Sequence, residues 1–152
     1  MSHNPRFLIV CSDFTRSISD ALLEGARETL LEAGVDEDHI DVVRVPGSFE
    51  IPVVAAAAAR RGRYEAIICL GCVIRGETSH YDFVAGQTAE GIMRASIDSE
   101  VPIIFGVLTT ENLAQAQARV GGEHGHKGAY SAAAALHMSR VMKQIKSTEV
   151  PR

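Results

Sequence analysis

Four short apolar runs, each followed by a stretch with helical periodicity, constrain the fold of this chain more than any other feature. The runs cover residues 7–11, 40–45, 66–70 and 103–108. The first and third are uninterrupted, which is typical of strands that are buried on both faces of a sheet. Strands that alternate with helices form a parallel sheet with helices on both faces, joined by right-handed crossovers. We therefore expect an α/β fold with four parallel strands, in one domain that spans residues 1–152.

Capping residues indicate where the helices should begin and end. The first helix is expected to begin near Ser17 or Ser19 and to stop at Gly34, because short hydroxyl side chains cap helix starts and glycine suits helix ends. Ser48 and Thr110 are predicted to cap the second and fourth helices. The last helix is expected to carry its apolar residues along one face: Ala134, Ala135, Met138, Val141, Met142 and Ile145.

Composition and charge narrow the class of protein. The chain has 152 residues, of which 46% are hydrophobic and 22% are charged, and a formal net charge of −4. These values indicate a globular protein and offer no bulk attraction for nucleic acid or an anionic membrane. Because no apolar run reaches membrane-spanning length and no signal peptide is apparent, we expect a cytoplasmic protein whose three cysteines are reduced thiols. Helices rich in alanine and glycine favour packing against other subunits.

The residues between the third apolar run and the next helix concentrate polar groups. Residues 71–82 read Gly-Cys-Val-Ile-Arg-Gly-Glu-Thr-Ser-His-Tyr-Asp, and a helix is expected at about 81–96. In an open parallel sheet, ligands bind beyond the carboxyl ends of the strands. A helix N-terminus there presents backbone N–H groups and a positive dipole end to an anion. We expect this turn to bind a phosphorylated group, with His80 as either a structural cap or a proton carrier.

Two further turns offer side chains for the same site. Residues 46–50 end another strand and carry Phe49, which could stack on a flat ring, and Glu50, which could accept hydrogen bonds from hydroxyl or ring N–H groups. The first turn offers Phe14 for the same stacking. These side chains would suit a heterocycle with a polyol arm.

The cysteines have a simple structural interpretation. Cys69 and Cys72 form a CxxC pattern at the end of a strand, whereas redox and metal motifs begin helices or form knuckles. Residues three apart on a strand face opposite sides of the sheet. We therefore expect two small buried residues there, and Cys11 is expected in the core.

The histidines near the last helix have two possible interpretations. His124 and His126, together with Lys127, could be a fragment of a metal site. Zinc sites need three or four ligands at defined spacing, and no partner set is apparent in the sequence. A solvated, glycine-rich loop at residues 121–128 is the better interpretation.

Three long segments, in this order along the chain, carry a resemblance to a known family. Residues 45–52 read Val-Pro-Gly-Ser-Phe-Glu-Ile-Pro, residues 71–82 are quoted above, and residues 105–112 read Phe-Gly-Val-Leu-Thr-Thr-Glu-Asn. Together they resemble the 6,7-dimethyl-8-ribityllumazine synthase family, and the likeness extends from about residue 7 to 145. The resemblance implies a flavodoxin-like three-layer α/β/α sandwich with a four-stranded parallel sheet.

The resemblance also implies an activity, that of a transferase in riboflavin biosynthesis. Family members condense 5-amino-6-(D-ribitylamino)uracil with 3,4-dihydroxy-2-butanone 4-phosphate and release phosphate and water. The product, 6,7-dimethyl-8-ribityllumazine, is the penultimate intermediate of the pathway. The resemblance implies that the reaction uses no cofactor and no metal.

Carried over residue by residue, the resemblance implies how the pyrimidine would be bound. Phe14 would stack on its ring, and Glu50 would bind the ribityl hydroxyls. Other residues would border the pyrimidine or contact its edge through the backbone: Ser48, Phe49, Cys72, Val73 and Ile74.

The resemblance assigns the phosphorylated substrate to a second group of residues. Glu77 and Thr78 would offer backbone N–H groups to the phosphate, and Arg119 would pair with it through its guanidinium fork. His80 would transfer protons. Because family sites lie between the subunits of a pentamer, three residues would reach the site from a neighbouring subunit: Phe105, Arg119 and Lys127.

The sequence departs from the family pattern in two places. Only residues 1–6 precede the first strand, and Pro5 lacks a backbone N–H, so the N-terminal strand that many members add to a neighbour's sheet is expected to be missing or very short. In the loop 121–128, Glu123 stands where the family often has Lys, and His126 where it often has Asn. We expect a pentamer, and a shell of twelve pentamers stays open.

Two other functions stay open at this point. A riboflavin synthase of the archaeal type is related to this family and would consume the lumazine itself. A non-catalytic shell protein would only bind a flavin or lumazine. The sequence retains Phe14, Glu50, His80 and Arg119, which favours an active enzyme. A protein that only bound its ligand would not need His80 for proton transfer.

Overall fold

The computed structural model describes residues 4–147, and a four-stranded sheet lies at its centre. All neighbouring strands are parallel, which confirms the α/β class and the number of strands expected from the apolar runs. The third and fourth strands extend past those runs, so residues 71–74 are strand and not turn. The strands, in the spatial order β2-β1-β3-β4, are β1 (Phe7–Ser12), β2 (Ile40–Val45), β3 (Ala66–Ile74) and β4 (Ile103–Thr110).

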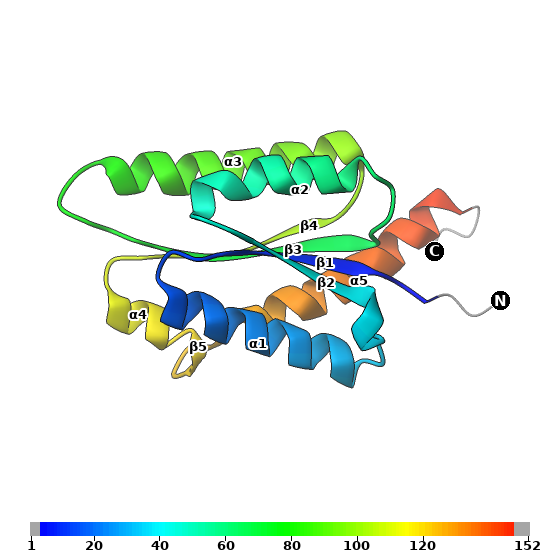
Figure 1. Ribbon diagram of the computed structural model, residues 1–152, viewed down its shortest axis with the longest axis horizontal. Coiled ribbons are helices and arrows are strands. Elements are labelled where there is room, and N and C mark those ends of the chain that lie inside the picture. Colours follow the sequence, from blue (N-terminus) through cyan, green and yellow to red (C-terminus); the bar gives the residue numbers. More distant parts are fainter. Residues whose placement is uncertain (1–3, 148–152) are drawn as a thin grey trace.

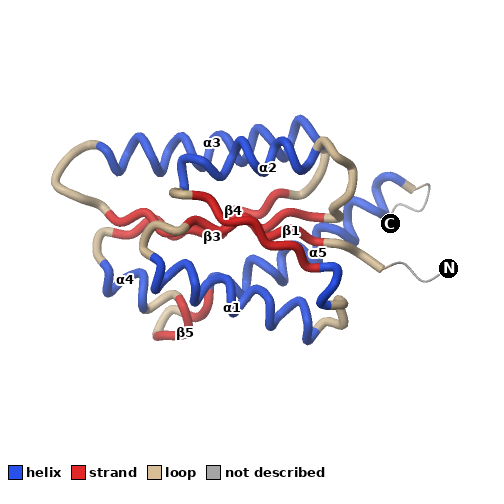
Figure 2. The backbone as a smooth tube through the Cα atoms, viewed as in Figure 1, coloured by secondary structure: helices blue, strands red, loops and turns tan. Residues whose placement is uncertain are grey.

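Two layers of helices enclose the sheet, as Figures 1 and 2 show. Helices α2 (Ile51–Ala59) and α3 (His80–Ser99) cover one face, and α1 (Arg16–Glu32) and α5 (Lys127–Lys146) cover the other. This arrangement confirms the three-layer, flavodoxin-like sandwich. The shorter elements are the 3-10 turns η1 (Glu37–His39) and η2 (Ser48–Glu50), helix α4 (Leu113–Gln117), and the strands β5 (Val120–Gly122) and β6 (Gly125–His126).

The sheet divides the buried side chains into two cores. Since successive residues of a strand face opposite sides, Cys69 packs with α2 and α3 while Cys72 packs with α1 and α5. This confirms that the CxxC residues are separate and buried. All three cysteines are free thiols. Burial raises the pKa of Cys72 to about 11 and raises the pKa of Cys69 further, so both thiols stay protonated and unreactive near neutral pH.

The predicted caps of the first two long helices are wrong. Helix α1 begins at Arg16, and Thr15 occupies its N-cap position with a left-handed φ of 57° and no side-chain cap bond. Ser48 starts η2 instead of α2 and is buried. The capping preference of serine does not reveal that the chain first makes a tight turn against the sheet at residues 48–50.

The predicted cap of the fourth helix is also wrong. Thr110 is the last residue of β4, and its hydroxyl donates to the Asn112 carbonyl oxygen over 2.9 Å. Asn112 caps α4, because its side-chain oxygen accepts from the Gln115 N–H over 2.9 Å. Asparagine caps helices as well as threonine does, so the sequence alone does not distinguish the two starting points.

The buried face of α5 differs from the expected one. Of the expected residues Ala135 is buried, whereas Ile145 is 56% exposed and the others are partly exposed. Helix α5 lies so close to α1 that a Cβ on Gly128 would overlap the Leu22 carbonyl oxygen. Small side chains therefore form the contact, and the buried residues of α5 are Gly128, Ser131, Ala132 and Ala135.

The segment 121–128 is exposed at residues 121–124, as expected of a solvated segment, but it is not an irregular loop. It forms the antiparallel β5–β6 hairpin and leads directly into α5. The His126 ring accepts a hydrogen bond from the Ala129 N–H over 3.3 Å, which caps α5, and it packs against Gly25 of α1. Within residues 4–147, no group of three or more His, Cys, Asp or Glu side chains is placed to hold a metal ion.

The two ends of the described chain lie together, away from the strand-to-helix turns (Figure 1). The prediction of a missing exchanged strand concerns in part residues 1–3, which lie outside the described residues. The residues that follow contact their own chain, since the Asn4 amide donates to Asp36 over 2.9 Å and Arg6 pairs with Asp41 at 3.3 Å. Among the described helices, none combines the length and the apolar character needed to cross a bilayer.

Candidate active site

The carboxyl ends of the strands meet at one end of the sheet, where all four strand-to-helix connections lie (Figure 1). Backbone hydrogen bonds join these connections in pairs. The Phe14 N–H donates to the Pro46 carbonyl over 3.1 Å, which holds the first turn beside the second. The Arg75 N–H donates to the Thr110 carbonyl over 2.8 Å, which holds the third beside the fourth. The topology thus brings together the turns singled out in the sequence.

A cavity of about 620 Å³, which we call the turn cavity, opens between the first three of these turns and the start of α3. Its volume lies within the range of small-molecule sites. Nine of the predicted site residues line it: Phe14, Ser48, Phe49, Glu50, Cys72, Val73, Ile74, Thr78 and His80. Five residues that were not predicted also line it: Gly47, Gly76, Tyr81, Phe83 and Val84.

Three phenylalanine rings give the turn cavity its apolar walls. Phe14, Phe49 and Phe83 are 73%, 55% and 64% exposed, although phenylalanine is among the residues most often found inside proteins. Exposed rings that gather around one cavity offer flat apolar faces to a ligand. The side chain of Glu50 lines the same cavity and supplies a hydrogen-bond acceptor.

The end of β3 forms the floor of the turn cavity. The Cys72 side chain packs into the core beside α1 and α5, on the opposite face of the sheet from α2 and α3, so it is the backbone of Cys72 that this residue offers to a ligand. Gly71 allows the β2–α2 turn to lie close to this strand. A Cβ on Gly71 would be 2.6 Å from the Ser48 hydroxyl oxygen and 2.9 Å from that of Ser12.

The polar end of the turn cavity is the N-terminus of α3. The His80 N–H donates to the Thr78 hydroxyl over 3.3 Å, and the Ser79 carbonyl accepts from the Asp82 N–H over 3.0 Å. The first backbone N–H groups of a 20-residue helix point toward this end. Glu77, a predicted site residue, does not line the cavity, but it lies between Gly76 and Thr78, which do.

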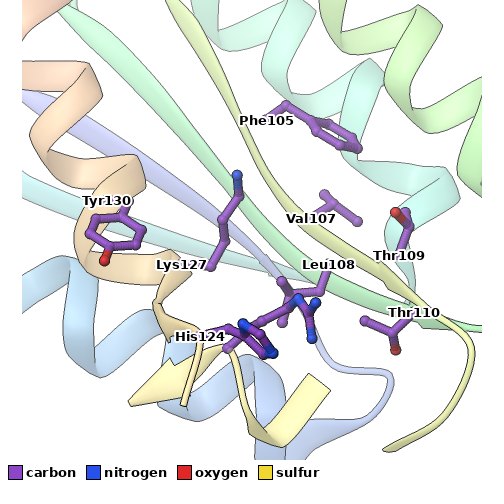
Figure 3. Close-up of a pocket in the computed structure, with 9 residues that line it drawn as sticks. Phe105, Val107, Leu108, Thr109, Thr110, His124, Lys127 and Tyr130 are labelled. Carbon is purple, nitrogen blue, oxygen red and sulfur yellow. The ribbon is translucent and has the colours of Figure 1, made fainter. Parts of the chain in front are cut away.

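A second cavity, which we call the edge cavity, lies beside β4 at the edge of the sheet and has a volume of about 310 Å³. In Figure 3 the Lys127 side chain lies between Tyr130 of α5 and Phe105 of β4. The three remaining predicted residues line this cavity: Phe105, Arg119 and Lys127. Its other lining residues are Val107, Leu108, Thr109, Thr110, His124 and Tyr130.

Backbone contacts fix the two cationic residues of the edge cavity. The Lys127 N–H donates to the Arg119 carbonyl over 2.8 Å, which joins the start of α5 to the segment between α4 and β5. The Arg119 guanidinium donates to the Gln115 carbonyl over 2.8 Å and keeps further N–H groups for an anion. The edge cavity therefore presents positive charge beside an aromatic ring.

The two cavities share no lining residue. The residues that sequence reasoning missed are neighbours of predicted ones, since Tyr81 follows His80 and Val84 lies one helical turn further along α3. Tyr130 lies one turn after Lys127 on α5. Helical spacing from a predicted residue could have identified Val84 and Tyr130.

Comparison with known protein families gives one match. The family model described as 6,7-dimethyl-8-ribityllumazine synthase matches residues 4–143. The matched region includes the four strands of the sheet, the four helices that cover it apart from the last residues of α5, and both cavities. The chain therefore belongs to the 6,7-dimethyl-8-ribityllumazine synthase family, a family of transferases in riboflavin biosynthesis.

Proposed function

We propose that this chain is a single-domain cytoplasmic enzyme that condenses 5-amino-6-(D-ribitylamino)uracil with 3,4-dihydroxy-2-butanone 4-phosphate. The product is 6,7-dimethyl-8-ribityllumazine. One observation carries the proposal: twelve of the thirteen predicted substrate-binding and catalytic residues line two cavities whose chemistry matches the parts of the two substrates. The family match supports the same pathway.

The turn cavity is the proposed site of the pyrimidine. Phe14 stacks on the ring in this proposal, and the backbone of residues 72–74 contacts its polar edge. Glu50 accepts hydrogen bonds from the ribityl hydroxyls. The exposure of the phenylalanine rings and the burial of the Cys72 side chain support these assignments.

The phosphate of the second substrate is proposed to bind at the N-terminus of α3. Backbone N–H groups of Glu77 and Thr78, together with the Thr78 hydroxyl, face the anion, and the helix dipole favours negative charge there. Arg119 supplies a guanidinium fork. Because Arg119 lines the edge cavity, it would reach this phosphate from a second copy of the chain.

A ring of copies would join the two half-sites. We propose a pentamer in which the edge cavity of one copy, with Phe105, Arg119 and Lys127, closes the turn cavity of the next. Head-to-tail contacts of this kind form a ring when the rotation between successive copies closes on itself. Exposed apolar side chains on α2 and α3, such as Val53, Met93 and Ile97, support an assembly that would bury them.

The proposed chemistry needs proton transfers more than a strong nucleophile. The pyrimidine amine attacks the ketone, and loss of water gives an imine. Removal of a proton then expels phosphate, the ribitylamine nitrogen closes the second ring on the new carbonyl, and a second water leaves. His80 carries protons in this scheme, and the site holds the reactants together, which alone can be worth about 7–11 kcal/mol.

A fluorescence assay tests the proposal. The purified chain is mixed with both substrates, and formation of the fluorescent lumazine is followed against the uncatalysed reaction. The proposal predicts product at a rate far above that background. A rate equal to background would contradict it, and consumption of the lumazine itself would instead identify a riboflavin synthase.

A further inference from the structure

Arg75 lies in the β3–α3 turn, lines neither cavity, and makes three contacts with other elements. Its Nε lies 2.8 Å from Glu111 Oε2, beyond the end of β4, and its Nη1 lies 3.5 Å from Asp82 Oδ1 on α3. Its guanidinium carbon lies 4.3 Å from the centre of the Tyr81 ring. Two of these three partners are the residues that directly follow His80 in the sequence.

The turn that Arg75 spans has little packing of its own. Residues 75–80 are all exposed, and a Cβ on Gly76 would meet no atom within 4 Å. Loops with few buried contacts open and move more readily than packed elements. Tyr81 packs against the core, but the residues before it do not, so Arg75 adds contacts at the point where the exposed turn joins α3.

We propose that Arg75 is a positioning residue, which holds the first turn of α3 against the β4–α4 connection and thereby orients His80 in the turn cavity. This inference rests on the proposed function only for what His80 does. The contacts themselves, and the prediction that their loss loosens residues 76–83, are independent of the substrate.

Arginine suits this positioning role better than lysine does. A planar guanidinium can lie over the Tyr81 ring while its separate N–H groups reach Glu111 and Asp82 on two different elements. A lysine ammonium offers one point of charge and no planar face. Since Arg75, Asp82 and Glu111 are 40%, 60% and 58% exposed, these pairs should add little to global stability.

The kinetic test compares Arg75→Ala and Arg75→Lys with the wild-type enzyme in the lumazine assay. We expect Arg75→Ala to lower kcat about 10- to 100-fold with little change in either KM, because small misplacements of a catalytic group cost this much. Arg75→Lys should recover only part of the loss. The matched control is Arg94→Ala, which removes another exposed arginine of α3, paired with Glu90 at 3.7 Å, and should leave kcat unchanged.

A double variant tests whether Arg75 acts through His80. In a His80→Ala background, Arg75→Ala should cause no further loss of kcat, because the group that it positions is absent. The same fold loss in both backgrounds would overturn the proposal. A loss confined to the KM of the butanone phosphate would also overturn it, since Arg75 would then be a substrate ligand.

Amide hydrogen exchange on the substrate-free protein separates this inference from the proposed function. Exchange at residues 76–83 should be faster in Arg75→Ala than in wild type and unchanged in Arg94→Ala, with equal thermal unfolding of all three proteins. Unchanged exchange at residues 76–83 would overturn the positioning role even if the enzyme makes the lumazine. Absence of lumazine formation by the wild type, with the exchange effect present, would overturn the proposed function and leave the positioning of the turn supported.

Discussion

The turn cavity and the edge cavity differ in how they are built and in the groups that they present. The turn cavity lies where the strand-to-helix turns meet, and combines aromatic rings with Glu50, His80 and the N-terminus of α3. The edge cavity lies beside the outermost strand β4 and presents Arg119 and Lys127. Each cavity lacks a charged group that the other supplies: among the described residues, no arginine or lysine lines the turn cavity, and no carboxylate lines the edge cavity. The fold therefore provides two cavities of different chemistry at separate places, which the proposed function treats as two halves of one site.

The largest expected effect concerns proton transfer in the turn cavity. His80→Ala should lower kcat by about 10²- to 10⁴-fold, the usual contribution of one general acid or base. Activity should not vanish, because both reactants are still held together. Steady-state kinetics of the lumazine assay measures the change, and His137→Ala, at an exposed position of α5, is the matched control. Complete loss of activity in a folded His80→Ala protein would contradict this account.

The second effect concerns the edge cavity. Arg119→Ala should raise the KM of the butanone phosphate about 10- to 100-fold, because hydrogen bonds to charged groups contribute roughly 1.5–3 kcal/mol. The KM of the pyrimidine should change much less. Arg140→Ala, which removes an exposed arginine of α5, serves as control. An unchanged KM for the phosphorylated substrate would remove Arg119 from the phosphate site.

The third prediction distinguishes the role of the Cys72 side chain from that of the Cys72 backbone, which lies at the floor of the turn cavity. Burial raises the pKa of Cys72 from 9.0 to about 11, so its neutral thiol stabilises the fold fully below pH 9, and this contribution is lost as the pH rises through 11. The wild type should therefore lose about 2–3 kcal/mol more than Cys72→Ala between neutral and strongly alkaline pH, from the two-unit shift.

Urea unfolding of wild type and Cys72→Ala at both pH values measures this difference. The kcat of Cys72→Ala at neutral pH should equal that of the wild type, since the side chain faces away from the turn cavity. Parallel loss of stability in the two proteins would contradict the assigned burial of the thiol. A fall in kcat at neutral pH would show that the side chain itself contributes to the site.

Much of the fold could be predicted from the sequence, because the sheet depends on a pattern that is local. Continuous apolar runs such as residues 66–70 can only be satisfied by burial on both faces, and the alternation with helices then requires parallel strands. The separation of Cys69 from Cys72 followed from strand geometry alone. These predictions needed no information about neighbouring elements.

The errors arose where a partner element decides the outcome. Asn112 and Thr110 can both cap a helix, but pairing with β3 extends β4 through Thr110 and leaves the cap to Asn112. The buried face of α5 consists of small residues because α1 lies close to Gly128, and the sequence pattern of larger apolar residues does not report that distance. His126 caps α5 because a hairpin places it there.

In the candidate site, too, the sequence could not predict what depends on how distant elements pack together. The residues carried over from the family resemblance were found in the cavities, apart from Glu77, but the sequence by itself did not separate Phe105, Arg119 and Lys127 from the others. That separation depends on where β4 lies in the sheet. Arg75 lies in the segment 71–82 that the sequence singled out, but the sequence assigned it no role, because its partners Glu111 and Tyr81 are brought together only by the fold.

The most direct test of the two half-sites is complementation between His80→Ala and Arg119→Ala. Each variant damages a different cavity, so copies that associate at random into rings should form about one quarter of their composite sites from two intact halves. Co-expressed chains, assayed at limiting butanone phosphate, are predicted to recover about that fraction of wild-type activity. Activity no greater than the mean of the two separate variants, in mixed oligomers shown by mass spectrometry, would contradict a site shared between copies.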